Sequence, residues 1–272
     1  MKDIIDNINY QWLLKLNSLV ISSLKSKPRD LQIYELLNSH TEVDMNYPIL
    51  SVKNRKLGYK FNFRESWYIL DGRNDVESIK YYSKIISSFS NNGIFYDGSY
   101  GLMVLDQLSY IVDTLSEDID SRQAVLTIWR PNPRPSKDIP CTISLQWIIR
   151  NNKIYCFDTM RSSDIWLGWP YDIHNMTMIT GFIMLMLRER GINNLELGTI
   201  SLNAGSQHLY ENNWEKAIDV LNNNESFDYV KFNPYLFDSP MDFKHYLKAL
   251  SECDSKKLNQ YRSCYGQDVL QI

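Results

Sequence analysis

One segment, from Ile173 to Arg188, is apolar on all sides for most of its length. A helix that is apolar all round is normally enclosed by other parts of the protein. Its longest apolar part, from Met176 to Leu187, is interrupted by Thr and Gly and is too short to cross a bilayer. We therefore expect a central buried helix in a water-soluble protein that does not enter a membrane.

Three segments ahead of this helix are rich in β-branched and aromatic residues, which favours strands. They run over Ala124 to Trp129, Thr142 to Ile149 and Lys153 to Asp158. The Arg150-Asn-Asn turn between the last two predicts a hairpin.

Two further segments predict helices. The first, Ile4 to Leu24, has apolar residues at helical spacing, and the second, Phe63 to Leu70, looks like a buried helix end that carries one acid, Glu65. The chain has no repeat and no Gly/Ser linker, and 44% of its 272 residues are hydrophobic. We expect residues 1–272 to form a single α+β domain.

The overall charge and the cysteines exclude several classes of function. The formal net charge is -3 and the pI about 5.8, so a polymeric nucleic-acid partner is not expected, although a local pocket for one phosphate remains open. The four cysteines are far apart and form no CxxC pair. Neither a zinc site nor a disulfide scaffold is indicated, no metal is expected, and a reducing cytoplasm is the expected location. The first ten residues lack the order of a signal peptide.

A thiol and an arginine are the first candidates for chemistry. Cys141 follows the proline-rich loop from Pro131 to Pro140 and opens a predicted strand. A lone cysteine is more often an inert core residue than a nucleophile. The Arg161-Ser162 pair changes this weighing, because it can bind phosphate and because an arginine near a cysteine favours the thiolate.

Two more clusters have both an ordinary and a functional interpretation. Arg161 and Asp164 could form a surface ion pair, but the aromatic residues around Gly168 are more typical of a nucleotide pocket with a stacking wall. His208 and Tyr210 are two residues apart and would face the same side of a strand. Core packing is the default for that pair, and recognition of sugar hydroxyls is the alternative.

Taken together, these motifs resemble thymidylate synthases. The resemblance runs over roughly residues 29 to 216 and rests on the order of several motifs. These are Arg-Glu65-Ser-Trp-Tyr-Ile-Leu-Asp-Gly72, Tyr100-Gly101, Asp-Ser-Arg122, Pro140-Cys141, Arg161-Ser-Ser-Asp164 with Leu-Gly168-x-Pro, and His208-Leu-Tyr210-x-Asn. The resemblance implies a mixed sheet packed with helices, with one sheet face forming a homodimer interface.

The resemblance also implies a role for each matching residue. Cys141 would be the thiolate that adds to C6 of a pyrimidine, and Glu65 with Tyr100 would manage protons through ordered water. Arg161, Ser162 and Arg29 would hold the 5′-phosphate, joined by Arg122 from the second subunit at a shared active site. The folate 5,10-methylenetetrahydrofolate would be the co-substrate. It would be bordered by Asp164, Gly168 and Tyr171, and the ribose by His208 and Tyr210.

Departures from the thymidylate synthase pattern concern the base and the folate. Asp172 stands where synthases have the asparagine that binds uracil, and an acceptor-only carboxylate favours the amino group of cytosine. Thr142 replaces a histidine after the nucleophile; phage cytidylate hydroxymethylases are similar at both positions. The tryptophan-bearing segment that covers the folate is absent between Tyr82 and Tyr100, and Gln123 replaces the second arginine of an Arg-Arg pair.

We therefore expect a cytidylate 5-hydroxymethyltransferase that acts on CMP or dCMP. Alternatives are a thymidylate synthase or a cytidylate C5-methyltransferase, in which hydride replaces water. A catalytically inactive protein that binds pyrimidine nucleotides is an alternative of another class. The sequence leaves open the choice between ribose and deoxyribose.

Overall fold

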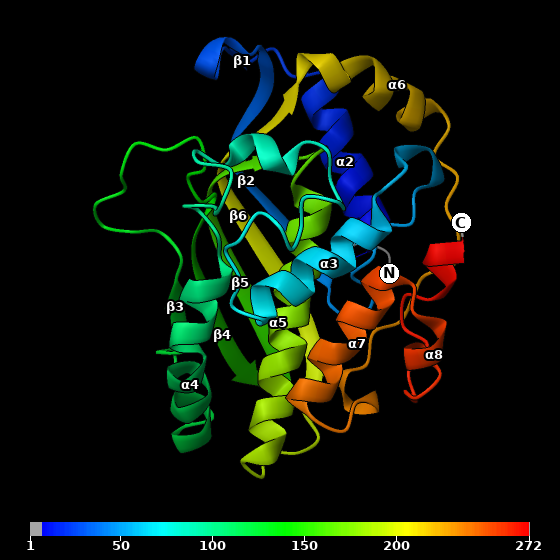
Figure 1. Cartoon of the computed structure of the whole chain (residues 1–272). Helices are drawn as coiled ribbons and strands as arrows, with labels where there is room; N and C mark the ends of the chain where they lie inside the picture. Colours follow the sequence, from blue (N-terminus) through cyan, green and yellow to red (C-terminus); the bar gives the residue numbers. More distant parts are fainter. Residues whose placement is uncertain (1–6, 272) are drawn as a thin grey trace.

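A computed structural model describes residues 7–271 of the chain. Its strands form one mixed sheet in the order β1-β2-β6-β5-β4-β3 (Figure 1). The strands are β1 (Lys25–Ser26), β2 (Ile33–Asp44), β3 (Val125–Thr127), β4 (Thr142–Arg150), β5 (Lys153–Asp164) and β6 (Glu196–Tyr210). β5 and β6 are parallel, and the other neighbouring pairs are antiparallel. The expected α+β fold with a mixed sheet is confirmed.

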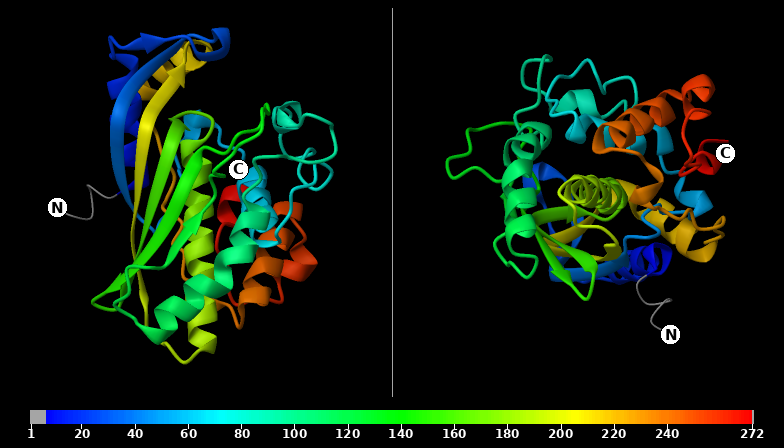
Figure 2. Two further views of the ribbon diagram at one scale, coloured as in Figure 1. Left: turned by 90° about the vertical axis from the view of Figure 1, so that its left-hand side faces the viewer. Right: turned by 90° about the horizontal axis from the view of Figure 1, so that it is seen from below.

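The helix α5 (Trp169–Glu189) connects the two parallel strands and lies at the centre of the molecule. All its residues from Ile173 to Leu185 are buried, because the sheet covers one side and α3 (Tyr59–Leu70), α4 (Gly101–Glu117) and α7 (Pro240–Glu252) surround the others (Figures 1 and 2). The expectation of an enclosed helix is confirmed. Within residues 7–271, no helix combines the length and the apolar character needed to span a membrane.

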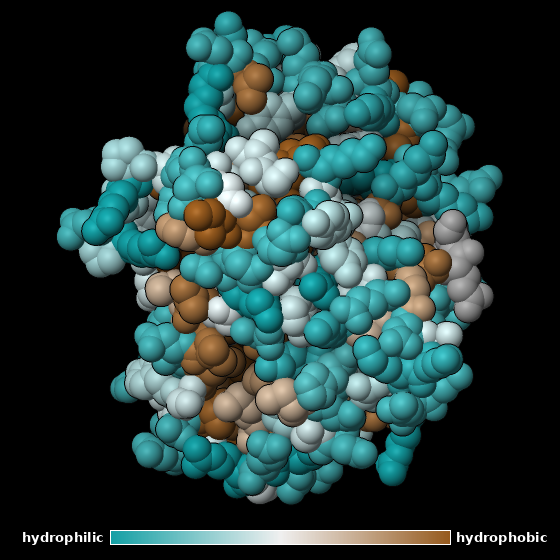
Figure 3. Space-filling model, in the orientation of Figure 1, coloured by the Kyte–Doolittle hydropathy of each residue, from teal (hydrophilic) through white to brown (hydrophobic). Residues whose placement is uncertain are grey.

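The remaining helices are shorter or lie at the edge of the sheet. They are α2 (Ile8–Val20), α6 (Trp214–Asn222) and α8 (Ser255–Leu258), with 3₁₀ turns at Pro28–Asp30, Lys53–Arg55, Ile86–Phe89, Glu211–Asn213, Pro234–Leu236 and Asp268–Gln271. Figure 3 shows a largely polar surface on the face seen in Figure 1, with separate apolar patches, some of them over α4. Leu102 and Leu105 of α4 are about half exposed.

Most of the predicted elements are present with shifted ends. The hairpin between β4 and β5 turns at Asn151 and Asn152, which both have positive φ, as two-residue hairpin turns require. β5 continues six residues beyond the predicted end at Asp158, because its polar second half pairs with β6. The first helix ends at Val20 rather than Leu24, and its predicted start at Ile4 lies outside the described residues.

Candidate active site

Arg161 holds the loop that carries Cys141. Its Nε donates a hydrogen bond to the carbonyl of Pro140 and its Nη2 donates to the carbonyl of Ile139, both at 2.9 Å. The same Nη2 lies 3.8 Å from Cys141 Sγ. The guanidinium group of Arg161 also lies over the ring of Trp129. One arginine therefore fixes the end of the proline-rich loop and adjoins the thiol.

Burial and the nearby charged groups together set the pKa of the Cys141 thiol. Burial raises the pKa of Cys141 to about 11, Arg161 lowers it, and the carboxyl groups of Asp172 and Asp138 raise it further. The influence of Arg161 has the expected sign, but burial outweighs it, so the thiol is protonated at neutral pH in this structure. Arg161 thus favours the thiolate, as the sequence predicts, but does not by itself overcome the effect of burial.

A cavity of about 180 Å³ lies beside the loop that carries Cys141. Its polar wall includes Glu65, Tyr100, Asp172 and Asn175, and its apolar wall includes Ile79, Ile86 and Phe89. Sites for drug-sized ligands are usually about 300 Å³ or larger. A single heterocycle, such as a pyrimidine base or the pterin ring of a folate, is therefore a better match than a whole folate.

Glu65 occupies this cavity from α3. Its Oε2 accepts a hydrogen bond of 2.7 Å from the side-chain amide of Asn175, which in turn accepts one of 2.6 Å from Ser66. Burial raises the pKa of Glu65 to about 7, although the bond from Asn175 opposes this shift. A carboxyl group with such a pKa can both take and give a proton near neutral pH.

Asp172 faces the same cavity from the first turn of α5. Burial, and then the charges of Asp158, Glu65 and Asp164, raise the pKa of Asp172 well above its usual value. Burial and these neighbouring acids favour the protonated form of the carboxyl group, which offers one donor and one acceptor. The acids around Asp172 oppose the ionised, acceptor-only form that is expected from the sequence.

Tyr100 links the cavity to the residue after the nucleophile. Its hydroxyl oxygen accepts a hydrogen bond of 3.0 Å from the backbone N–H of Thr142. Burial raises the pKa of Tyr100 well above its usual value, and so do the neighbouring Cys141 and Asp172. The hydroxyl therefore keeps a proton that it can donate into the cavity.

Asp164 and His208 lie opposite each other at the ends of β5 and β6. Asp164 Oδ1 accepts hydrogen bonds from the backbone N–H groups of Trp166 and Leu167, at 2.8 and 3.0 Å. Burial raises the pKa of Asp164 and lowers that of His208, while each group's charge opposes the other's shift. The ring of Tyr210 packs edge-on against His208, with centroids 5.1 Å apart. His208 and Tyr210 thus share one side of β6, as the sequence predicts.

Gly168 and Tyr171 lie at the start of α5. A Cβ at Gly168 would come within 3.3 Å of Asp172 Oδ2, so this position leaves little room beside the Asp172 carboxyl group. The hydroxyl of Tyr171 accepts a hydrogen bond of 3.1 Å from the N–H of Gly58, and its ring meets that of Phe61 edge-on.

The remaining predicted residues differ in how close they come to the site. Ser162 lies on β5 beside Ser206 of β6, next to Arg161. Arg29 is exposed in the turn before β2, close enough to His208 to lower its pKa. Arg122 is exposed, and its backbone carbonyl accepts a hydrogen bond from Gln146. Within the described chain, no hydrogen bond or ion pair joins the Arg122 guanidinium group to the other predicted site residues.

Three polar residues of the site are not predicted from the sequence: Asn175, Asp158 and Arg55. Asn175 lies one helical turn after Asp172, and this spacing could have indicated it. Asp158 is a lone acid at an inward position of an apolar strand. Arg55 is buried, stacks on Trp166 and donates a short hydrogen bond to its carbonyl. It also lies close enough to Tyr171 and Asp164 for their charges to act on its pKa.

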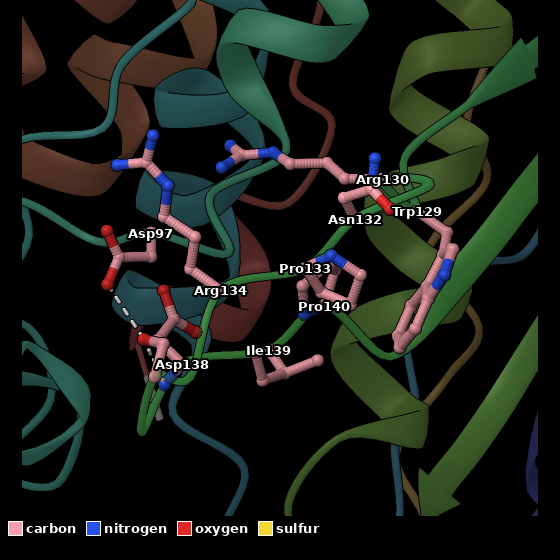
Figure 4. Close-up of a pocket in the computed structure, with 10 residues that line it drawn as sticks. Asp97, Trp129, Arg130, Asn132, Pro133, Arg134, Asp138, Ile139 and Pro140 are labelled. Carbon is pink, nitrogen blue, oxygen red and sulfur yellow. Dashed lines mark hydrogen bonds between the residues drawn. The ribbon is translucent and has the colours of Figure 1, made fainter.

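A second cavity, of about 310 Å³, borders the proline-rich loop (Figure 4). Arg130 and Arg134 extend toward one side of it, and Trp129 lies at the other end. Asp97 accepts a hydrogen bond of 2.7 Å from Ser136 of the loop, and Asp138 accepts one of 2.7 Å from the N–H of Gly98. Asp138 lines both cavities, so this loop separates them.

Comparison with known proteins bears directly on this arrangement. The family model described as "Thymidylate synthase" matches residues 22–245. A curated relative, the deoxyuridylate hydroxymethyltransferase of Bacillus phage SP01, is 29% identical in a match that covers 58% of this chain and 45% of the phage protein. The chain thus spans about half the length of that relative.

Proposed function

Because this chain belongs to the thymidylate synthase family, we propose that it is a folate-dependent one-carbon transferase acting on C5 of a pyrimidine nucleotide. The observation that carries this proposal is the position of the Cys141 thiol beside Arg161, with Tyr100 and Asp172 of the cavity that also holds Glu65 near enough to act on its charge. A nucleophile, a base and an acid are the groups that substitution at C5 through a covalent adduct requires.

We propose hydroxymethyl transfer to cytidylate as the reaction. The name of the phage relative supports a hydroxymethyl product. The segment from Tyr82 to Tyr100, where synthases have their tryptophan-bearing cover, contains no tryptophan, and Ile86 and Phe89 of this segment line the cavity. A folate that is less enclosed lets water reach the reaction, whereas hydride transfer needs water to be excluded.

The first chemical step would join Cys141 to the base. The sulfur forms a bond to C6, the thiol proton leaves to solvent, and Asp172 gives its proton to N3 of cytosine. The electron pair of the C5–C6 double bond thereby makes C5 nucleophilic. Protonation of N3 makes C6 more electrophilic. This promotes the addition and so compensates for the cost of ionising the buried Cys141 thiol.

The later steps would use Glu65. 5,10-Methylenetetrahydrofolate supplies a one-carbon unit at the oxidation level of formaldehyde. C5 forms a bond to that carbon, and Glu65 in its ionised form then removes the proton from C5. The bond between this carbon and the folate nitrogen breaks, the nitrogen takes up a proton, and a methylene group is left on the base. Water adds to that methylene, the bond between sulfur and C6 breaks, and Asp172 recovers its proton from N3. The products would be 5-hydroxymethylcytidylate and tetrahydrofolate.

Uridylate is the second candidate substrate, and a specific observation favours it. The phage relative is named for deoxyuridylate, and a protonated Asp172 can also donate to O4 and accept from N3–H of uracil. Only cytosine, however, has an N3 lone pair that can take the proton. We therefore place cytidylate first.

The test is incubation with methylenetetrahydrofolate and, separately, CMP, dCMP, UMP and dUMP, with products identified by mass. We expect a hydroxymethyl product from a cytidylate, with oxygen-18 incorporated from labelled water and no dihydrofolate absorbance. A methyl product with stoichiometric dihydrofolate would replace this proposal with a methyltransferase. Product from uridylates alone would refute the choice of base, and binding without product would favour an inactive nucleotide-binding protein.

We further propose that two chains form a dimer through the sheet face that points away from α5. Ile148 and Tyr155 are paired on this face, and Phe157 lies beside them; all three are half-buried in the single chain. The left view of Figure 2 shows the central helices against one face of the sheet that contains β4 and β5. Partly exposed apolar residues on such a face are typical of homodimer interfaces.

A further inference from the structure

Asp158 lies in an environment that does not compensate a carboxyl group. It occupies the middle of β5 on the face toward α5, its exposed fraction is 0%, and its neighbours in register are the buried Leu145 and Leu202. Neither of its carboxyl oxygens has a hydrogen-bond partner of good geometry among residues 7–271. Buried polar groups in proteins are almost always paired, so an unpaired acid needs an explanation.

The polar groups around Asp158 belong to the proposed active site. The hydroxyl of buried Thr142 lies close enough to Asp158 to lower its pKa, although the two groups do not have the geometry of a hydrogen bond. Asp172 lies close enough for its pKa to be raised by Asp158 more than by any other charged group. Burial raises the pKa of Asp158 itself to about 8.

No cation compensates these two acids. Asp172 is surrounded by Asp158 and Asp164 from β5, Glu65 from α3, Tyr100 at the start of α4 and Cys141 before β4. The nearest arginines act on other groups: Arg161 lies at Cys141, and Arg55 acts on Asp164. Within the described chain, neither Asp158 nor Asp172 forms an ion pair. Neighbouring carboxyl groups without a cation resist ionising together.

We propose that Asp158 is a positioning residue that acts through Asp172: by resisting the ionisation of both groups together, it keeps a proton on Asp172 that can be donated to N3 of the pyrimidine. This role rests on the proposed function and adds to it the reason why the acid of the site stays protonated. Asp158 need not touch the nucleotide, because it acts through the electrostatic cost of placing a second negative charge on Asp172.

The test is the alkaline limb of the pH profile of kcat/KM for the cytidylate substrate. Wild-type activity should fall at high pH as Asp172 loses its proton. In Asp158→Asn, which is similar in size but cannot ionise, Asp172 should ionise more easily. The alkaline limb should therefore move to lower pH by about one unit. At a fixed pH on that limb, this shift corresponds to a kcat/KM that is about tenfold lower.

Cys156→Ala is the matched control. Cys156 is buried on the same face of β5, two residues from Asp158, and takes no part in the proposed chemistry. Its substitution disturbs packing without removing the acid, so its alkaline limb should coincide with that of the wild type. A merely structural role for Asp158 would lower kcat/KM equally at every pH in Asp158→Asn, and an unshifted limb would overturn the inference.

Failure of the inference can be distinguished from failure of the proposed function. A wild-type protein that converts none of the four nucleotides would refute the function, whereas a working enzyme with an unshifted limb would refute only the role of Asp158. If Asp158→Asn does not fold, Asp158→Leu, which matches the apolar surroundings, serves in its place. If neither folds, infrared spectra of the wild type at neutral pH should show the carbonyl stretch of a buried protonated carboxylic acid. Absence of that band would also overturn the inference.

Discussion

The reactivity of Cys141 depends on what surrounds a single sulfur atom. Burial raises the pKa of the thiol and so keeps it protonated. The charge of Arg161 lowers this pKa, and the nearby acids raise it further. A thiol that ionises only when its target is in place is protected from unwanted reactions with other electrophiles and oxidants. The free protein should therefore react slowly with alkylating reagents near neutral pH.

Substitution of Cys141 tests the nucleophile directly. We expect Cys141→Ala to lose turnover almost entirely and to retain nucleotide binding, because the proposed phosphate and base contacts come from other side chains. Release of tritium from C5 of the substrate is the measurement, with calorimetric binding as the control. Undiminished release in the alanine variant would remove Cys141 from the mechanism.

We expect Glu65 and Asn175 to determine the acid limb of the pH profile of kcat/KM. The unfolded carboxyl group has an ordinary pKa near 4.3, while the folded one is raised to about 7, so Glu65 gains its charge only as the pH passes neutrality. If the ionised form is the base, kcat/KM should rise through about pH 7. Asn175→Ala removes the 2.7 Å hydrogen bond that stabilises the charge, and the limb should move to higher pH by about one unit.

Ser66→Ala is a suitable comparison for that variant, because the Ser66 hydroxyl donates to the oxygen of the Asn175 amide, whereas Glu65 accepts from its nitrogen. It should shift the limb less. An acid limb that stays in place in Asn175→Ala would mean that Glu65 is not the group that titrates.

At the scale of elements, α5 supplies both the core and part of the site. Its first turn carries Asp172 and its second carries Asn175, while its later turns are enclosed by the sheet and by other helices. The apolar sequence predicts this enclosed helix well, because burial on all sides leaves a signal in every turn. The rigid body of α5 then fixes the acid at its N-terminal end.

Gly181 tests how closely this helix is packed. A Cβ at this position would lie 2.7 Å from the Phe232 ring, which is itself buried. Gly181→Ala should lower the free energy of unfolding by about 1–3 kcal/mol, because overpacking outweighs the better helix propensity of alanine. Chemical denaturation measures this, and Glu189→Ala at the exposed end of the same helix should change stability little. A stabilised Gly181→Ala would show that Phe232 can move away.

What the sequence could not predict lies mainly in pairings between distant strands. β2 and the second half of β5 contain many polar residues, so their local pattern does not indicate strands. They are strands because β2 pairs antiparallel and β5 pairs parallel with β6 over a long register. For the same reason Asp158 looked like the last residue of a strand rather than an acid enclosed at its middle. Cys141, Glu65 and Arg161 could be proposed from motif order, whereas the raised pKa of Asp172 depends on acids that only the fold brings together.

At the scale of the whole molecule, the exposed position of Arg122 leaves its proposed role to a second copy of the chain. Arg122→Ala and Cys141→Ala should each be impaired alone. Mixed in equal amounts and allowed to exchange subunits, they should regain about a quarter of wild-type activity, because half the dimers are mixed and each holds one intact site. Sedimentation measures the dimer, and a monomer at assay concentration would reject a shared site.

The position of β6 in the sheet also has a consequence for the order of folding. β2 has only the two-residue β1 on one side, and on the other it pairs with β6, from Ile33 opposite Tyr210 to Asp44 opposite Thr199. During synthesis the N-terminal strand must therefore wait until most of the chain has left the ribosome. Such non-local pairing slows folding and leaves strand edges open to association. A nascent chain halted before residue 196 should then depend on chaperones that shield β2, and release of the completed chain should end that dependence.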